Sequence, residues 1–258
     1  MIGSLFPQLP PRSRRGFGIC LAALLALLLG SALLRWQAPM IAIAAVAGPL
    51  LFVGYILEIG ISRGAPISRL VGIAAIGAAL GIGWAYVAGE VFADGYDVAL
   101  GFETSTGPTV LSAVGISIVE VLLMFVPALV MRIVDRSDRG PRAGYLIGAL
   151  GATAFTAAAT ATLLSPQLAT GLLADQRSYV GLLVEAGIQG VAMPLASAAV
   201  GGMFGIALWS RPLRGAAVSA VVAVSVVLFL VLGLLDISPF SNGVYVAGYL
   251  VVAALALL

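Results

Sequence analysis

Long apolar stretches separated by short polar segments occupy almost the whole chain. An α-helix needs roughly 17 to 25 residues of this kind to cross the hydrocarbon core of a bilayer. The stretches run over residues 16–34, 39–61, 67–89, 108–131, 143–164, 182–209, 215–235 and 243–258. The pattern predicts an all-α, polytopic transmembrane helical bundle of about eight spans, formed by a single integral-membrane domain over residues 1–258.

The first and last stretches each leave an alternative open. Arg12, Arg14 and Arg15 precede the first stretch like the basic region of a signal peptide, but no small-residue cleavage pattern follows it. We therefore expect an uncleaved span. The last stretch is short, so it either crosses a thinned bilayer or packs as a partial helix, which would give seven spans. The natural chain continuing beyond Leu258 is a further interpretation.

The arginines fall on alternate connections between the stretches. With a cytoplasmic N-terminus, only Arg35 and Arg177 lie outside. The other arginines would lie inside, at positions Arg12, Arg14, Arg15, Arg63, Arg69, Arg132, Arg136, Arg139, Arg142, Arg211 and Arg214. Cytoplasmic loops of membrane proteins carry such an excess of positive residues. The sequence therefore predicts a multi-pass protein of the plasma (inner) membrane with its N-terminus in the cytoplasm.

The composition is typical of a membrane protein and argues against metal sites, enzymatic activity and nucleic-acid binding. Of the 258 residues, 61% are hydrophobic and 9% are charged, and the chain has one cysteine and no histidine. Without histidine, metal sites that pair His with Glu cannot form. We find no nucleophile motif and expect no metal and no cofactor, so an enzyme is disfavoured. The net charge of +2 is too small to favour binding to nucleic acid.

Glu120 stands at the middle of the stretch 108–131. An ionised acid near the bilayer centre is costly, so Glu120 is expected to be protonated, paired or turned towards protein or water. Ser117 lies one turn before Glu120, and Pro127 lies two turns after it. Because Pro127 has no backbone N–H, it leaves the carbonyl of Leu123 free. A polar or proton-linked site at Glu120 and a purely structural hydrogen bond are the two interpretations.

Two further spans carry polar residues that would complete such a site. In the sixth, Glu185 and Gln189 are one turn apart, and Pro194 releases the carbonyl of Gly190. By itself, Glu185 is better explained as an interfacial acid. In the fifth, Thr153, Thr156 and Thr160 share one helix face. These hydroxyls line a polar path or, as is commoner, bond back to carbonyls of their own helix.

Glycines at four-residue spacing predict close helix packing. The pairs are Gly77 with Gly81, Gly144 with Gly148, and Gly201 with Gly205. Such ridges serve either internal packing, which is the commoner use, or association with a second protein.

Two functions follow as hypotheses. The first is a small transporter or channel-like protein with its site at Glu120, and the alternative is a non-catalytic subunit or assembly factor of a membrane complex. A lower third option is an intramembrane enzyme that uses carboxylates alone. The expected partners are the lipid bilayer and, in the second case, a membrane protein or further copies of the chain.

Overall fold

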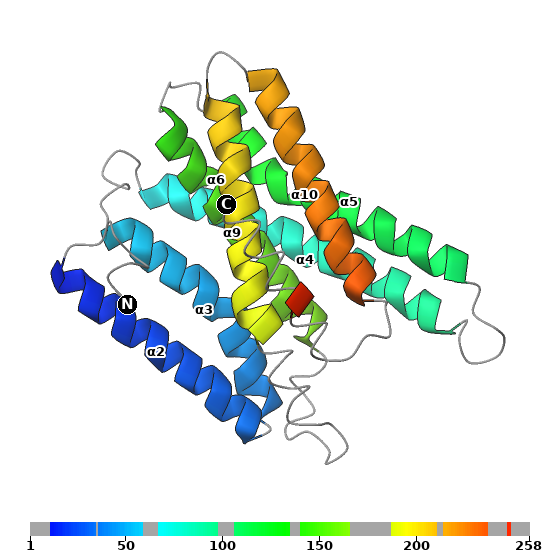
Figure 1. Ribbon diagram of the computed structural model, residues 1–258, viewed down its shortest axis with the longest axis horizontal. Helices are drawn as coiled ribbons and strands as arrows, with labels where there is room; N and C mark the ends of the chain where they lie inside the picture. Colours follow the sequence, from blue (N-terminus) through cyan, green and yellow to red (C-terminus); the bar gives the residue numbers. More distant parts are fainter. Residues whose placement is uncertain are drawn as a thin grey trace.

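The computed structural model describes residues 11–34, 36–58, 67–97, 106–134, 140–165, 187–210, 214–236 and 247–248. These residues form seven α-helices and one π-helical turn, and no β-strand forms among them. In chain order the elements are α2 (Pro11–Leu33), α3 (Gln37–Glu58), α4 (Ile67–Asp97), α5 (Thr106–Val134), α6 (Gly140–Leu163), η3 (Ile188–Ala192), α9 (Met193–Trp209) and α10 (Arg214–Asp236) (Figure 1).

The all-helical architecture predicted from the sequence is confirmed. Within the described residues, six helical segments are long and apolar enough to cross a membrane, with η3 and α9 counted as one, and a shorter apolar segment covers Ala38–Gly54 of α3. The chain is therefore a membrane protein by length and composition of its helices. The predicted last span lies outside the described residues, apart from 247–248, as do residues 182–186 of the sixth.

The predicted third span, residues 67–89, agrees with the apolar span Ile67–Glu90. The helix that carries it, α4, continues beyond the span to Asp97. Loss of hydrophobicity marks the edge of the hydrocarbon layer, but it does not end a helix, because the backbone hydrogen bonds continue without regard to side-chain polarity.

α6 occupies the centre of the bundle, with α4 on one face and α9 on another. A Cβ atom added to Gly77 or Gly81 of α4 would run into the carbonyl oxygens of Gly151 and Phe155, respectively. Gly144 of α6 is equally close to the backbone of α9 at Gly205. Because only glycine allows backbones to approach this closely, the ridges predicted from the sequence serve packing inside the bundle.

Neighbouring contacts fix the relative directions of the helices. The contacts of α4 with α6 advance together along both helices, so these two run parallel. Gly144 meets Gly205 and Gly148 meets Gly201, so α6 and α9 are antiparallel. Phe125 of α5 stacks on Phe204 of α9 with ring centroids 4.0 Å apart, and the Arg132 guanidinium lies 5.5 Å from the Trp209 ring centroid. α5 and α9 therefore run in the same direction.

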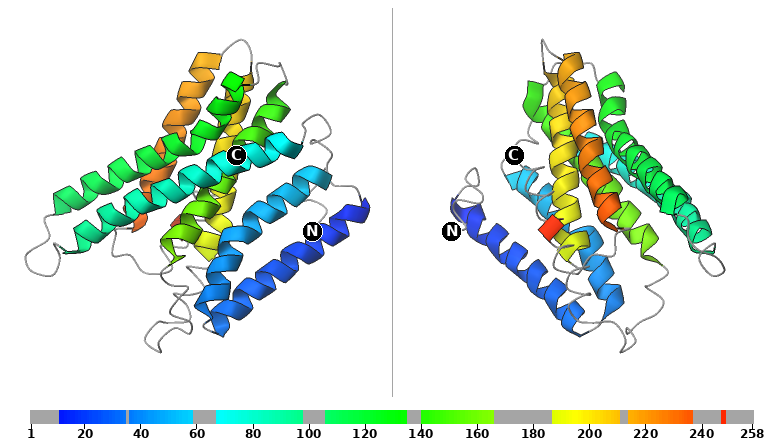
Figure 2. Two further views of the ribbon diagram at one scale, coloured as in Figure 1. Left: turned by 180° about the vertical axis from the view of Figure 1, so that it is seen from behind. Right: turned by 45° about the vertical axis from the view of Figure 1, so that its right-hand side comes forward.

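Helix ends of opposite charge lie on opposite sides of the bundle. The starts of α2, α4, α6 and α10 share one side with the ends of α3, α5 and α9 (Figures 1 and 2). This side carries Arg12, Arg14, Arg15, Arg69, Arg132, Arg142 and Arg214, together with Glu58 at the end of α3. The ends of α4 and α10, on the other side, carry Glu90, Asp94, Asp97 and Asp236. We call these the arginine side and the acidic side.

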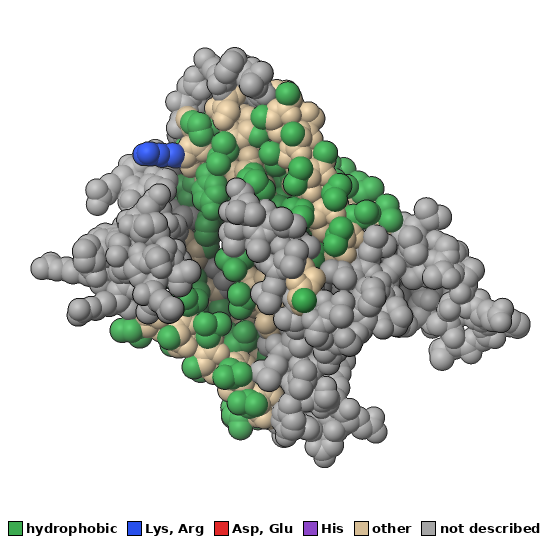
Figure 3. Space-filling model, in the orientation of Figure 1, with side chains coloured by type: hydrophobic (Ala, Val, Ile, Leu, Met, Phe, Trp, Pro, Cys, Tyr) green, Lys and Arg blue, Asp and Glu red, His purple; other side chains and the backbone are tan. Residues whose placement is uncertain are grey.

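The outside of the bundle is apolar, as expected for a surface in contact with lipid. Ile19, Val71 and Ile133 are 61–69% exposed, and hydrophobic side chains dominate the described part of the face in Figure 3. The main core is built around Phe125 and Phe155, which are at most 2% exposed. α2 and α3 form a separate small core, and they lie at one edge of the molecule (Figure 1).

Candidate intramembrane polar site

The threonine face of α6 is buried inside the bundle. Thr153, Thr156 and Thr160 are 2%, 3% and 8% exposed, respectively. Thr153 lies near the middle of α6, and the other two follow at one-turn intervals towards the acidic side. The sequence therefore places a row of hydroxyls that begins at mid-depth and runs towards one surface of the membrane.

Thr156 pairs with Ser197 of α9. Their hydroxyl oxygens are 2.7 Å apart, and both residues are buried. Ser197 donates its own proton to the main-chain carbonyl of Met193 at 2.8 Å. Thr156 is therefore the donor to Ser197, because a hydroxyl has only one proton to donate. This assignment leaves the lone pairs of Thr156 as its remaining hydrogen-bonding capacity.

Thr160 makes a second cross-helix contact, to Gln189. Its hydroxyl donates to the side-chain oxygen of Gln189 over 3.4 Å. The usual length of an O–H···O bond is about 2.5–3.0 Å, so this contact is weak. Thr153, by contrast, donates to the carbonyls of Ala149 and Leu150 in its own helix. Back-bonding, which we expected as the commoner state of such threonines, thus holds for Thr153, while Thr156 and Thr160 reach across to the next segment.

Gln189 lies on a π-helical turn, which changes the direction of its side chain. Eight residues separate Gln189 from Ser197, and in a regular α-helix that spacing turns two side chains about 80° apart. A π-turn accommodates one extra residue, so the pair is separated by the equivalent of about seven α-helical residues and shares one face. The turn thus brings Gln189 and Ser197 to the same side of the segment, the side that faces α6.

The π-turn also leaves main-chain hydrogen-bonding capacity on this segment. The N–H of Met193 donates to the carbonyl of Ile188, five residues earlier. The next residue, Pro194, has no N–H and is buried. The carbonyl of Gln189 therefore loses both its α-helical donor, Met193, and its π-helical donor, Pro194. The sequence predicted that Pro194 frees the carbonyl of Gly190. It did not predict the π-turn, through which the carbonyl of Gln189 lacks a donor.

We refer to Thr153, Thr156, Thr160, Gln189 and Ser197 together as the hydroxyl seam. It is the polar part of the same α6–α9 interface in which Gly144, Gly148, Gly201 and Gly205 bring the backbones together. The glycine half lies towards the arginine side, where the two backbones are in close contact. The seam lies towards the acidic side, where side-chain hydrogen bonds replace the backbone contact.

Glu120 is the central residue of α5, with fourteen residues of the helix on either side. It is half-buried, and Ser117 one turn before it is 4% exposed. Two turns after Glu120, the Pro127 ring packs on Gly151 of α6. Together with the stacking of Phe125 on Phe204, this contact holds α5 against both helices of the hydroxyl seam.

The remaining candidate residues fall outside the site or were not foreseen. Glu185 lies outside the described residues. Ser197 was missed because α-helical spacing from Gln189 points it elsewhere. Ser225, the middle residue of α10, was also missed. It is 0% exposed, and its hydroxyl has no hydrogen-bond partner among the described residues.

No group of three or more His, Cys, Asp or Glu residues that could hold a metal occurs in the described part of the chain.

No protein-family model, curated protein or solved structure matches this chain.

Proposed function

We propose that the chain is a small multi-pass transporter or channel-like protein whose intramembrane site combines Glu120 of α5 with the hydroxyl seam. The observation that carries this proposal is the Thr156–Ser197 pair, set beside a π-turn and Pro194. The hydroxyl oxygens of Thr156 and Ser197 provide a polar route that starts at mid-membrane. The interrupted helix adds the main-chain carbonyl of Gln189 beside them. Interrupted helices with exposed main-chain groups are a common way to build such sites in transporters.

Packing requirements alone do not account for the seam. Towards the arginine side, the same two helices achieve close contact through glycines, with the Tyr145 ring of α6 packed on Gly202 of α9. Hydrogen bonds between membrane helices contribute only about 0.6 kcal/mol on average. A row of hydroxyls and an amide is thus a weak way to hold helices together, and it serves better as a path for a polar solute or a proton.

Glu120 supplies the titratable group of the proposed site. A carboxyl group at the centre of a membrane helix is expensive to keep unless it has a use, so such residues are functional hypotheses by default. The contacts of α5 with α6 and α9 place Glu120 on a helix that shares its neighbours with the seam. We therefore assign proton coupling to Glu120 and solute or proton passage to the seam.

The proposal includes a direction of threading. The arginine side is the cytoplasmic face of the plasma membrane under the rule that positive residues stay inside. The N-terminus is then cytoplasmic, and the seam opens towards the outer face. Eight spans remain the proposed total, with the eighth in residues 243–258.

The experiment uses protein reconstituted into vesicles that contain a pH-sensitive dye. An imposed membrane potential drives protons inwards, and the rate of internal acidification is measured. We expect the wild-type rate to exceed that of empty vesicles, and Glu120→Gln to reduce it to the empty-vesicle rate with equal incorporation. Glu90→Gln, which removes an exposed acid at the end of α4, is the matched control and should retain the wild-type rate.

An unchanged rate in Glu120→Gln would overturn the assignment of proton coupling. Wild-type protein with no activity above empty vesicles, for protons or for panels of small solutes, would count against the transporter class as a whole. The alternative, a subunit or assembly factor, predicts a stoichiometric partner after purification in mild detergent. The glycine ridges that suggested it are used inside the bundle, so it has less support than transport.

A further inference from the structure

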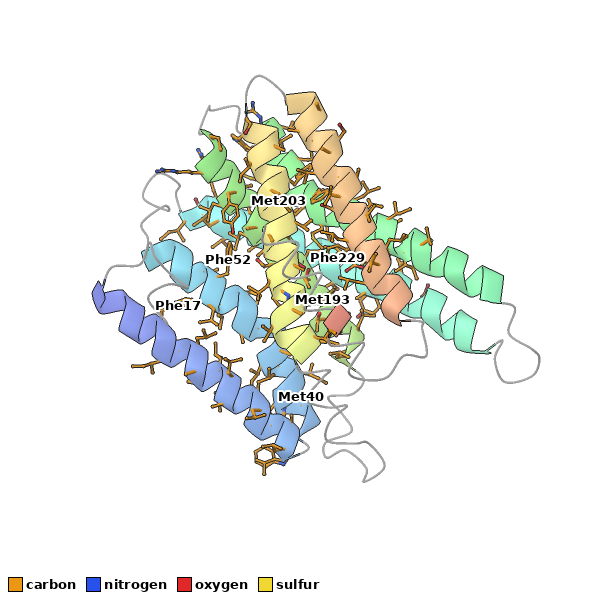
Figure 4. The ribbon with its side chains drawn as sticks, in the orientation of Figure 1. Phe17, Met40, Phe52, Met193, Met203 and Phe229 are labelled. Atoms are coloured by element: carbon orange, nitrogen blue, oxygen red, sulfur yellow. The ribbon has the colours of Figure 1, made fainter. Side chains whose placement is uncertain are left out.

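An apolar groove runs between α2 and α3 at the arginine side of the molecule. Its volume is about 560 Å³, and it is partly open to the surroundings. The α2 wall includes Gly16, Phe17 and Cys20, and the α3 wall includes Leu50 and Gly54. Phe17 is drawn between the two helices in Figure 4. Leu50 is 62% exposed, and Gly16, Cys20 and Gly54 are also exposed, so the described protein leaves the groove uncovered.

The lining of the groove determines what kind of ligand fits it. All of its side chains are apolar, apart from the thiol of Cys20. A polar solute would lose its hydration there without gaining hydrogen bonds. A hydrocarbon chain, in contrast, gains close contact with the walls and can enter sideways from the surrounding bilayer. The groove therefore suits an acyl chain.

The charge at one end of the groove selects the headgroup. α2 begins at Pro11, so Arg12, Arg14 and Arg15 immediately precede Gly16, where the lining starts. Glu58, one turn after Gly54, is the single acid on the adjoining end of α3. By sequence, the described start of α2 thus carries three arginines and the described end of α3 one glutamate. Clusters of arginine beside a membrane helix attract anionic lipid headgroups, which are concentrated in the cytoplasmic leaflet.

We propose that this groove is a binding site for an anionic phospholipid. One acyl chain lies between α2 and α3, and the phosphate lies at the arginine-bearing start of α2. The inference requires that the helices are embedded in a membrane with the arginine side in the cytoplasmic leaflet, and it does not require transport. Its failure would leave the proposed transport function untouched, and the failure of transport would leave this site in place.

Two glycines allow the groove to be filled without disturbing the fold. A Cβ added to Gly16 or Gly54 meets no other atom within 4 Å. Leucine at these positions therefore occupies the space of the lipid chain rather than colliding with the backbone. Gly83 of α4 is exposed and equally free of neighbours, but it lies on a different helix. Gly83→Leu is thus a matched control for a glycine-to-leucine change on a lipid-facing helix.

The test is native mass spectrometry of the full chain, purified with equal amounts of phosphatidylglycerol and phosphatidylcholine. We expect the wild-type protein to retain one phosphatidylglycerol in preference to phosphatidylcholine. Gly16→Leu combined with Gly54→Leu should lower retention at least tenfold, while Gly83→Leu should retain the lipid as the wild type does. Replacing Arg12, Arg14 and Arg15 by Gln should weaken the preference for the anionic lipid by about fivefold for each arginine.

A second measurement follows occupancy without any substitution, from a label on the groove wall. Cys20 is the chain's only cysteine, so a fluorescent label attached to it reports on this place alone. Phosphatidylglycerol with brominated acyl chains, present at a few per cent of total lipid, should quench the label more strongly than phosphatidylcholine brominated in the same way. Equal quenching, or equal lipid retention by the filled variant, would overturn the proposal. A filled variant that retains the lipid but changes from dimer to monomer would identify a second copy of the chain as the occupant instead.

Discussion

Thr156 and Ser197 face each other across the α6–α9 interface with their hydroxyl oxygens 2.7 Å apart and both side chains buried. The proton of Ser197 is already donated to the carbonyl of Met193. The pair therefore has a fixed polarity, in which Thr156 donates and Ser197 accepts. Substitution of Thr156 therefore removes the donor of the pair, whereas substitution of Ser197 removes the acceptor.

We first predict the strength of this pair. Thr156→Val keeps the shape of the side chain but leaves the Ser197 oxygen without its donor. Together with Ser197→Ala in a double-mutant cycle, it should give a coupling free energy between about 0.6 kcal/mol, the average between membrane helices, and about 1.7 kcal/mol, the maximum. The measurement is the free energy of unfolding by denaturing detergent. Thr162→Val is the matched control, since Thr162 bonds to Ala158 of its own helix. A coupling indistinguishable from zero would contradict the pairing.

The second prediction concerns the glycine contact between α6 and α9 on the arginine side of the hydroxyl seam. A Cβ at Gly148 would run into the carbonyl of Gly201 on α9, so Gly148→Ala must push the two backbones apart. We expect a loss of about 1 to 3 kcal/mol in the free energy of unfolding, the usual cost of overpacking a core. Gly72→Ala on α4, where no atom lies within 4 Å, should be neutral or slightly stabilising, because alanine favours helix. Equal effects of the two substitutions would show that α6 and α9 are less closely packed than described.

The same contacts explain why the sequence predicted so much of the fold. Apolar length alone placed the helices, because a membrane span has to satisfy its backbone hydrogen bonds within itself. The four-residue spacing of Gly144 with Gly148 indicated close packing, but it could not identify the partner helix. Only the folded chain shows that Gly205 and Gly201 of α9 supply the opposite surface.

The site was predicted less completely, for two physical reasons. Thr153, Thr156 and Thr160 were predicted to share one helix face, because helical spacing fixes which side chains lie together, and all three are buried. Ser197 escaped prediction because its alignment with Gln189 depends on a π-turn, and periodicity calculated for a regular α-helix does not include one. The role of Glu120 stays a prediction, because charge and depth restrict what an acid can do without selecting among its uses.

A third prediction concerns Ser225, whose hydroxyl is fully buried without a described hydrogen-bond partner. A buried hydroxyl without a partner costs roughly 1 to 3 kcal/mol. Ser225→Ala removes that cost while leaving only a small void, so we expect the free energy of unfolding to rise by about 1 kcal/mol. Ser197→Ala, measured in parallel, should lower it. A loss of stability in Ser225→Ala would instead show that a water molecule or another group bonds this hydroxyl in the folded protein.

The last prediction tests the direction in which the chain crosses the membrane. Glu90 and Arg142 are both exposed, and they belong to opposite sides of the bundle. In a Cys20→Ser background, Glu90→Cys should react in intact cells with a maleimide that cannot cross membranes. Arg142→Cys should react only after the cells are permeabilised, because positive residues flanking spans are retained in the cytoplasm. Labelling of denatured protein verifies that both cysteines are reactive. The reverse pattern would invert the topology and place the open end of the hydroxyl seam towards the cytoplasm, so that Glu120 would exchange protons with the other compartment.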